Sequence, residues 1–175
     1  LSAMHMQAGN DAKALAALEG AYNLGMLTEA NELQRLANYL AFAGIPHRAA
    51  RVMEKAMMEG QIESTAANYK TLANYWHQAK ELDPAIDTLA KSYKLAPNAE
   101  LQLKMARMMI QSKRYQDLVA FAAKPAANAS GEQRADLKFL TGVAYFEQQK
   151  PKEALSAFTQ AAQNGNVSGR ASPWI

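Results

Sequence analysis

The sequence predicts an all-α protein, a right-handed α-solenoid of about five stacked helix pairs, and three observations support this fold class. The 175-residue chain is rich in strong helix formers such as alanine, leucine, methionine and glutamine, whereas the β-branched residues valine and isoleucine are scarce. Apolar residues recur at steps of three and four, as on one face of a helix, rather than alternating as in a strand. A pattern of small and large residues also recurs along the chain with a nearly constant period.

The recurring pattern is clearest in the stretch GVAYFEQQKPKEALSAFTQAA, which runs from Gly142 to Ala162. Twelve residues separate the small residue of its first half, Gly142, from the small residue of its second half, Ala154. The same offset follows Ala37 and Ala73, and weaker copies start at Ala106 and Ser2. The successive starts at positions 2, 37, 73, 106 and 142 are 35, 36, 33 and 36 residues apart.

We interpret each repeat as two antiparallel helices, with its small residues where the helices cross and its large residues between neighbouring repeats. Trp76, Tyr145 and Phe158 are the expected large residues. The repeats are expected at roughly 1–26, 30–63, 66–98, 99–131 and 135–165. Residues 166–175 are expected to form a C-terminal tail or the start of a further helix, and Trp174 either docks on the last repeat or belongs to that helix.

Proline and glycine mark the expected helix ends. Pro46 and Pro151 occupy the same repeat position and are expected to begin second helices, where proline needs no amide hydrogen. Asp83 is expected to cap the helix that follows it, and Gly60 and Gly165 to end second helices in the left-handed conformation. The stretch KPAANASG, at 124–131, departs from the pattern and predicts a short second helix with a loose connection in the fourth repeat.

A period near 34 residues with these small and large positions resembles the tetratricopeptide repeat (TPR), and the resemblance covers nearly the whole chain. In that architecture the first helix of each repeat lines a concave groove, and its solvent-facing residues bind the partner. The groove implied here is rich in amides and basic in the middle, and it becomes more apolar toward Phe139, Val143 and Phe146. For any single residue a solvated helix face is the competing interpretation, so the prediction rests on the set. The predicted partner-binding residues are Gln34, Asn38, Lys70, Asn74, His77, Arg107 and Gln111.

Some TPR domains clamp a C-terminal carboxylate with lysine and asparagine residues from successive repeats. Lys70 and Asn74 resemble the first pair of such a clamp. The next repeat has Lys104 where the asparagine should stand, and the following one has Asp136 and Leu140 where cations should stand. The sequence therefore does not favour a carboxylate clamp.

No catalytic or metal-binding chemistry is indicated by the sequence. The chain has no cysteine, and His5, His47 and His77 are too widely spaced to suggest a metal site. Nucleotide-binding and hydrolase motifs are absent, so we expect no cofactor and no enzymatic activity. The net charge of +3 comes without a lysine- and arginine-rich block, and no apolar run approaches the roughly 20 residues of a membrane span. Neither nucleic-acid binding nor membrane insertion is therefore predicted.

Several stretches resemble a narrower bacterial family of TPR proteins encoded beside TonB–ExbB–ExbD energy-transducing systems. They are ALAALEGAYNLGMLTEANEL, YLAFAGIPHRAARVMEKAMMEGQIES (Tyr39–Ser64), NYKTLANYWHQAKELDPAIDTLAKSYKLAPNAEL (Asn68–Leu101) and the terminal Trp174. The resemblance implies a periplasmic protein linked to envelope transport. The opening LSAMHMQAGN has no signal-peptide features, and we interpret the chain as part of a longer protein.

The sequence thus predicts a non-enzymatic scaffold that presents a concave groove to a peptide or protein partner. The alternative is a structural packing module of a larger envelope secretion or assembly machine, in which end faces rather than the groove make the contacts. An enzyme is the third and weakest hypothesis. The sequence does not indicate the oligomeric state.

Overall fold

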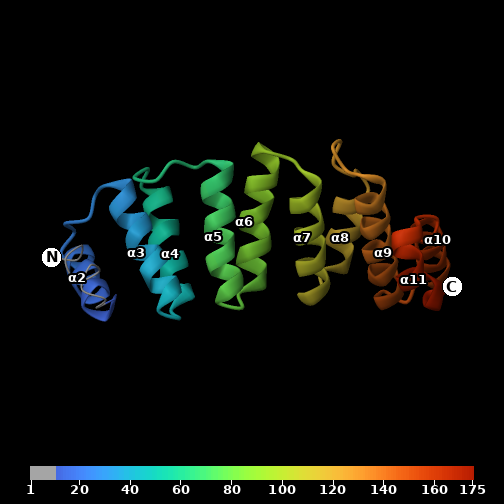
Figure 1. Ribbon diagram of the computed structural model, residues 1–175, viewed down its shortest axis with the longest axis horizontal. Helices are drawn as coiled ribbons and strands as arrows, with labels where there is room; N and C mark the ends of the chain where they lie inside the picture. The colour runs from blue at the N-terminus through green and yellow to red at the C-terminus, as the bar shows by residue number, and fades with distance from the viewer. Residues whose placement is uncertain (1–10) are drawn as a thin grey trace. The chain divides into compact units, whose positions relative to one another are not determined.

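The computed structural model describes residues 11–175, and every regular element in that range is a helix (Figure 1). The predicted start of the first repeat, with Ser2 and His5, lies outside the described residues. The helices are α2 (Asp11–Asn23), α3 (Ala30–Phe42), α4 (Pro46–Met58), α5 (Ala66–Gln78), α6 (Leu82–Leu95), α7 (Ala99–Gln111), α8 (Tyr115–Ala122), α9 (Gly131–Glu147), α10 (Pro151–Ala162) and α11 (Gly165–Ala171), followed by the 3-10 turn η1 (Ser172–Trp174).

The chain divides into two compact units, an N-terminal unit of residues 1–88 and a C-terminal unit of residues 89–175. In the N-terminal unit α3 packs on α4 and α4 packs on α5, so that each first helix contacts the second helix of the same pair or of the preceding one. In the C-terminal unit α9 contacts α7, α8 and α10, and α10 also contacts α11. Each unit thus repeats the same local packing of antiparallel helices.

The small residues of the repeat are buried, as the sequence predicts. Ala37, Ala49, Ala73 and Ala85 are at most 1% exposed. At the equivalent place in α9, a Cβ atom on Gly142 would lie 2.6 Å from ring atoms of Phe158 on α10. The absence of a side chain therefore lets Phe158 reach the α9 backbone, and this ring is itself only 1% exposed.

Some of the predicted helix ends are confirmed and two are wrong. Helices α4 and α10 begin at Pro46 and Pro151, and Gly60 has the left-handed φ of +76°. Asp83 does not cap a helix, because α6 already begins at Leu82 and places Asp83 in its first turn. Gly165 does not end α10 but is the first residue of α11, since the Asn164 side chain accepts a hydrogen bond from the Asn166 amide and caps this new helix.

The turn between the two helices of a pair has the same backbone conformation in four pairs, which the residue types there do not indicate. Gly44 has a φ of +79°, and the residues at the same turn of the next pairs also have positive φ, namely Lys80 at 65°, Lys113 at 60° and Gln149 at 59°. These four positions lie 36, 33 and 36 residues apart, which matches the repeat. Three of the four turns therefore place a residue with a side chain where glycine is favoured.

The fourth repeat has the short second helix that its sequence indicates, because α8 has 8 residues whereas α4 has 13. The stretch that follows α8 is fixed by Gln102 of α7, which is 1% exposed. Gln102 donates to the Lys124 carbonyl at 2.9 Å and accepts from the Ala126 amide at 2.8 Å. Asn128 accepts from the Ala99 amide at 3.2 Å. The connection expected to be loose is thus tied to α7 at several points.

Candidate functional site

The candidate site is the face made by first helices of successive pairs, called here the first-helix face. In the N-terminal unit it is formed by α3 and α5. The Gln34 side-chain amide donates to Asn68 Oδ1 at 3.4 Å, and the Tyr75 hydroxyl donates to Asn38 Oδ1 at 2.6 Å. These two bonds join residues 34 and 37 positions apart and hold α3 and α5 in a fixed register.

Local interactions at the start of α5 position one side of this contact. Thr65 caps the helix by accepting a hydrogen bond from the Asn68 amide at 3.1 Å. The Asn68 side-chain nitrogen donates to the Glu63 carbonyl at 2.8 Å, which leaves its oxygen to accept from Gln34. Tyr75, two turns further along α5, is 5% exposed, and burial raises the pKa of its hydroxyl above the ordinary value. Its proton is therefore kept for the bond to Asn38.

The predicted residues of this unit fall into two groups. Gln34 and Asn38 lie one turn apart on α3 and contact Asn68 and Tyr75, two residues that sequence reasoning did not identify. Lys70, Asn74 and His77 follow each other at steps of four and three, and therefore share one stripe of α5. At about 100° per residue, that stripe is roughly 100–180° around the helix from Asn68 and Tyr75. Lys70 and His77 are exposed and Asn74 is half-buried.

In the C-terminal unit the first-helix face is formed by α7, α9 and α11, and a carboxylate links all three helices. Asp136 of α9 pairs with Arg107 of α7 at 3.6 Å and with Arg170 of α11. The Asp136 side chain is 15% exposed, whereas those of Arg107 and Arg170 are 55% and 51% exposed. Arg107, which the sequence assigns to partner binding, is thus already engaged within the protein. Gln111, one turn further along α7, is exposed.

The expected apolar end of the groove is partly covered by the chain itself. The Phe146 ring meets Trp174 edge-on, with centroids 5.2 Å apart, and Trp174 also packs 5.2 Å from Phe158. The Arg170 guanidinium lies 5.5 Å from the centre of the Phe139 ring. The residues expected to form a tail or the start of a further helix are part of α11 and η1, which occupy apolar surface that the sequence offers to a partner.

A regular spacing could have revealed several of these contacts. Gln34 and Asn68, Glu132 and Asn166, and Asp136 and Arg170 are all 34 residues apart, and each pair forms a hydrogen bond. Because residues one period apart occupy neighbouring helices at the same height, complementary polar residues at this spacing are expected to meet. A search for such pairs at the repeat period would have found them.

Within residues 11–175 we find no helix long and apolar enough to cross a membrane. The same part of the chain holds no cluster of three or more histidine or acidic side chains placed to bind a metal ion.

A scan against models of protein families finds no match, and a search of curated proteins finds none either. Solved structures do match. A crystal structure of MamA is 16% identical with a TM-score of 0.60, and the match covers 97% of both chains. MamA from Desulfovibrio magneticus RS-1 is 15% identical with a TM-score of 0.53, over 77% of this chain and 74% of that one. The C-terminal part of a TPR repeat-containing protein from Cytophaga hutchinsonii is 10% identical with a TM-score of 0.57, and the match covers 93% of this chain and 62% of that one.

At these identities the matches show the fold alone. Together with the uniformly helical elements, they confirm the predicted fold class, an all-α solenoid of TPR-like helix pairs. None of them bears on the narrower resemblance to TonB-associated proteins or on the periplasmic location, which stay predictions.

Proposed function

We propose that this chain is a non-enzymatic protein-interaction scaffold whose first-helix face binds a peptide or protein partner. The observation that carries the proposal is the pair of hydrogen bonds that join α3 to α5, from Gln34 to Asn68 and from Tyr75 to Asn38. They hold α5 against α3, so the stripe of Lys70, Asn74 and His77 on another side of α5 is fixed in place before any partner arrives. A preordered surface binds more tightly because less conformational entropy is lost on association.

The chemistry of the exposed residues indicates what this face can recognise. Asn38 uses its side-chain oxygen for Tyr75, so its amide nitrogen is directed to other acceptors. Lys70 and His77 add exposed nitrogen donors on α5. Amides and an ammonium group suit the carbonyl oxygens of an extended peptide and the carboxylates of its side chains. We therefore infer a partner segment that is extended and rich in acceptors.

The proposal is tested by selecting peptides from a random display library on the immobilised chain and measuring their affinity by calorimetry. Lys70→Ala combined with His77→Ala should weaken the selected peptides that are extended and rich in acceptors about tenfold or more, while the melting temperature stays the same, because both side chains are exposed. Lys94→Ala is the matched control, since Lys94 is an exposed lysine of the second helix α6. Equal loss of binding in the control, or no loss in the double variant, would refute the assignment.

We also infer, from the stretches Tyr39–Ser64 and Asn68–Leu101, that the partner belongs to a bacterial envelope transport system and that the protein is periplasmic. Fractionation of the native host with markers for each compartment tests this location. Recovery of the protein with the cytoplasmic marker would contradict it, and would leave the proposed binding face unaffected.

One observation favours the alternative of a packing module in a larger assembly. Phe146 and Trp174 pack together in the C-terminal unit, yet they remain 52% and 43% exposed. A photo-crosslinking amino acid placed at Lys70 or at Trp174 separates the two functions in living cells. Crosslinks from position 70 support the first-helix face, whereas crosslinks confined to position 174 support the packing module.

A further inference from the structure

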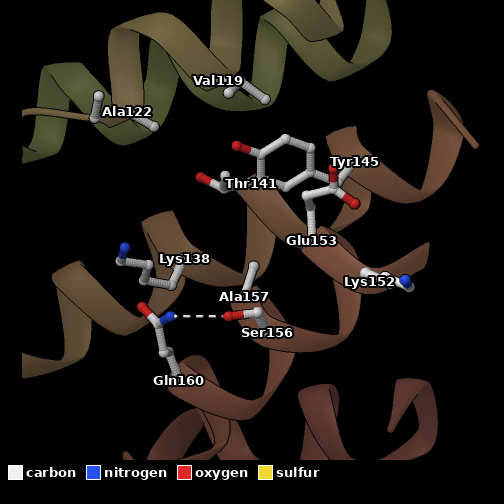
Figure 2. Close-up of a pocket in the computed structure, with 11 residues that line it drawn as sticks. Val119, Ala122, Lys138, Thr141, Tyr145, Lys152, Glu153, Ser156, Ala157 and Gln160 are labelled. Atoms are coloured by element: carbon white, nitrogen blue, oxygen red, sulfur yellow. Dashed lines mark hydrogen bonds between the residues drawn. The ribbon is translucent and has the colours of Figure 1, made fainter. Parts of the chain in front are cut away.

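A pocket of about 510 Å³ in the C-terminal unit is lined by residues of the second helices α8 and α10 and of α9 (Figure 2). Helix α9 contributes Lys138, Thr141 and Tyr145, which lie on one stripe because they are spaced by three and four residues. In Figure 2 the side chains of Thr141 and Tyr145 are drawn between Val119 of α8 and Ala157 of α10. This pocket shares none of the residues assigned to the first-helix face.

The pocket exists because α8 is short. Helix α8 stops at Ala122 after 8 residues, whereas α10 continues for 12. The stretch that follows α8 does not fill the space left, because Gln102 and Asn128 bond it to α7. Ala123 alone among the residues of that stretch lines the pocket. The pocket therefore occupies the space that further turns of α8 would fill if α8 were as long as the other second helices.

The lining of the pocket combines apolar walls with positive charge. Val119, Ala122 and Ala157 supply apolar surface, and Lys138 and Lys152 stand among the exposed residues around it. Glu153 is the one carboxylate in the lining. The apolar walls can bury a partner's aliphatic side chains, and the cations favour carboxylates beside them.

A smaller hollow of about 330 Å³ shares Lys138 and Gln160 with the pocket and adds Arg134. Among the described residues, no ion pair is found for Arg134, Lys138 or Lys152. Arg134 and Tyr145 are 11 residues apart on α9, which corresponds to a length of about 16 Å, or roughly three helical turns. The two hollows together thus offer a trough of helical length with three cations along it.

We propose that this trough is a second docking site, which binds an acidic amphipathic helix of a protein partner. The occupant is a helix because the trough replaces the missing turns of α8 and is bordered by helical stripes of α8, α9 and α10. The occupant is acidic because three unpaired cations outnumber the single carboxylate Glu153. Its apolar residues, at steps of three and four, face Val119, Ala122 and Ala157.

The experiment uses the full chain and a displayed library of random peptides about 15 residues long, roughly four helical turns. Selected peptides are synthesised and their affinities measured by calorimetry at two ionic strengths. We expect enrichment of aspartate or glutamate beside apolar residues at helical spacing, and affinity that falls as salt rises. Lys138→Glu with Lys152→Glu should weaken these peptides at least about tenfold, because two attractions become repulsions.

Two further variants separate the pocket from general electrostatic attraction. Arg35→Glu with Lys94→Glu changes the net charge equally at exposed residues outside the trough, and should leave the affinity within about twofold. Ser156→Trp adds a bulky neutral side chain to an exposed lining residue, and should abolish binding by filling the pocket. Circular dichroism melts confirm that each variant is folded.

The proposal is overturned if no acidic helical sequence is enriched, if Ser156→Trp binds these peptides as well as the wild type, or if the control pair weakens binding as much as the lysine pair. Loss of binding of the acidic helical peptides in the Lys70→Ala and His77→Ala variant would place those peptides on the first-helix face and likewise reject the trough. That result would leave the proposed scaffold function standing, so the two proposals fail separately.

Discussion

Gln102 and Ala126 are joined by a hydrogen bond of 2.8 Å from the Ala126 amide to the Gln102 side-chain oxygen, in a site that excludes water. The nitrogen of the same side chain donates to the Lys124 carbonyl at 2.9 Å and to the Phe121 carbonyl at 3.4 Å. One glutamine of α7 therefore satisfies three backbone groups around the end of α8. Because the Ala126 amide is buried, its hydrogen bond depends on this side chain.

Gln102→Ala should lower the free energy of unfolding by about 1–3 kcal/mol, since it leaves the buried Ala126 amide without its partner. Urea unfolding followed by circular dichroism measures the loss, and hydrogen exchange should show faster exchange of the Ala126 amide. Gln111→Ala, an exposed change on the same helix, should have almost no effect. Similar losses for the two variants would show that the buried bonds are not responsible.

The left-handed turns predict opposite effects for two substitutions at equivalent positions. Lys113 has a φ of 60°, which is unfavourable for a residue with a side chain, so Lys113→Gly should raise the free energy of unfolding by up to about 1 kcal/mol. Gly44 has a φ of +79°, which is unfavourable for a residue with a Cβ atom. Gly44→Ala should therefore lower the free energy of unfolding by about 1 kcal/mol, although the added Cβ would meet no other atom within 4 Å. Urea melts of both variants provide the measurement. Destabilisation by Lys113→Gly would mean that the unfolded-state entropy of glycine outweighs the strain.

Two glycines of the C-terminal unit provide a test of packing with one and the same substitution. Gly142→Ala places a Cβ 2.6 Å from the buried Phe158 ring and should cost about 1–3 kcal/mol by overpacking. Gly169→Ala, in α11 with no atom within 4 Å of the added Cβ, should stabilise the protein by about 0.5–1 kcal/mol through helix propensity. Adding Phe158→Leu should recover part of the loss at position 142. If Gly142→Ala is equally destabilising in the presence of Phe158→Leu, contact with the Phe158 ring is not the cause of the loss.

The helices and their crossings could be predicted from the sequence because they depend on local propensity and on a pattern that repeats. The pattern identified Ala73 and Gly142 as crossing residues, and both are buried. The left-handed turns at Lys80 and Gln149 were missed, because neither residue type signals positive φ. There the packing of the flanking helices, rather than the residue itself, determines the backbone conformation.

The candidate site was less predictable because it depends on contacts between repeats. Arg107 has the exposure expected of a binding residue, yet it forms an ion pair with Asp136, 29 residues later. Gln102 stands within an apolar helical run and gave no sign that it would anchor a distant loop. Such pairings depend on which side chains meet across neighbouring helices, and a single helix pattern does not contain that information.

The bond between Tyr75 and Asn38 predicts how the stability of the N-terminal unit depends on pH. Tyr75→Phe removes a hydrogen bond of 2.6 Å and should cost about 0.5–1.5 kcal/mol at neutral pH. Burial raises the pKa of folded Tyr75 above its unfolded value of about 10. Below pH of about 10 the hydroxyl is protonated in both states, and its contribution to stability is fully present.

As the pH rises past about 10, Tyr75 ionises first in the unfolded chain, which lowers the free energy of the unfolded state. The contribution of Tyr75 is therefore lost progressively until the pH reaches the folded pKa, whereas phenylalanine has no proton to lose. The difference in unfolding free energy between the wild type and Tyr75→Phe should thus narrow above this pH. Urea melts at a series of alkaline pH values measure this difference. If the unfolding free energies of the wild type and of Tyr75→Phe change with pH in parallel, folding does not raise the pKa of Tyr75.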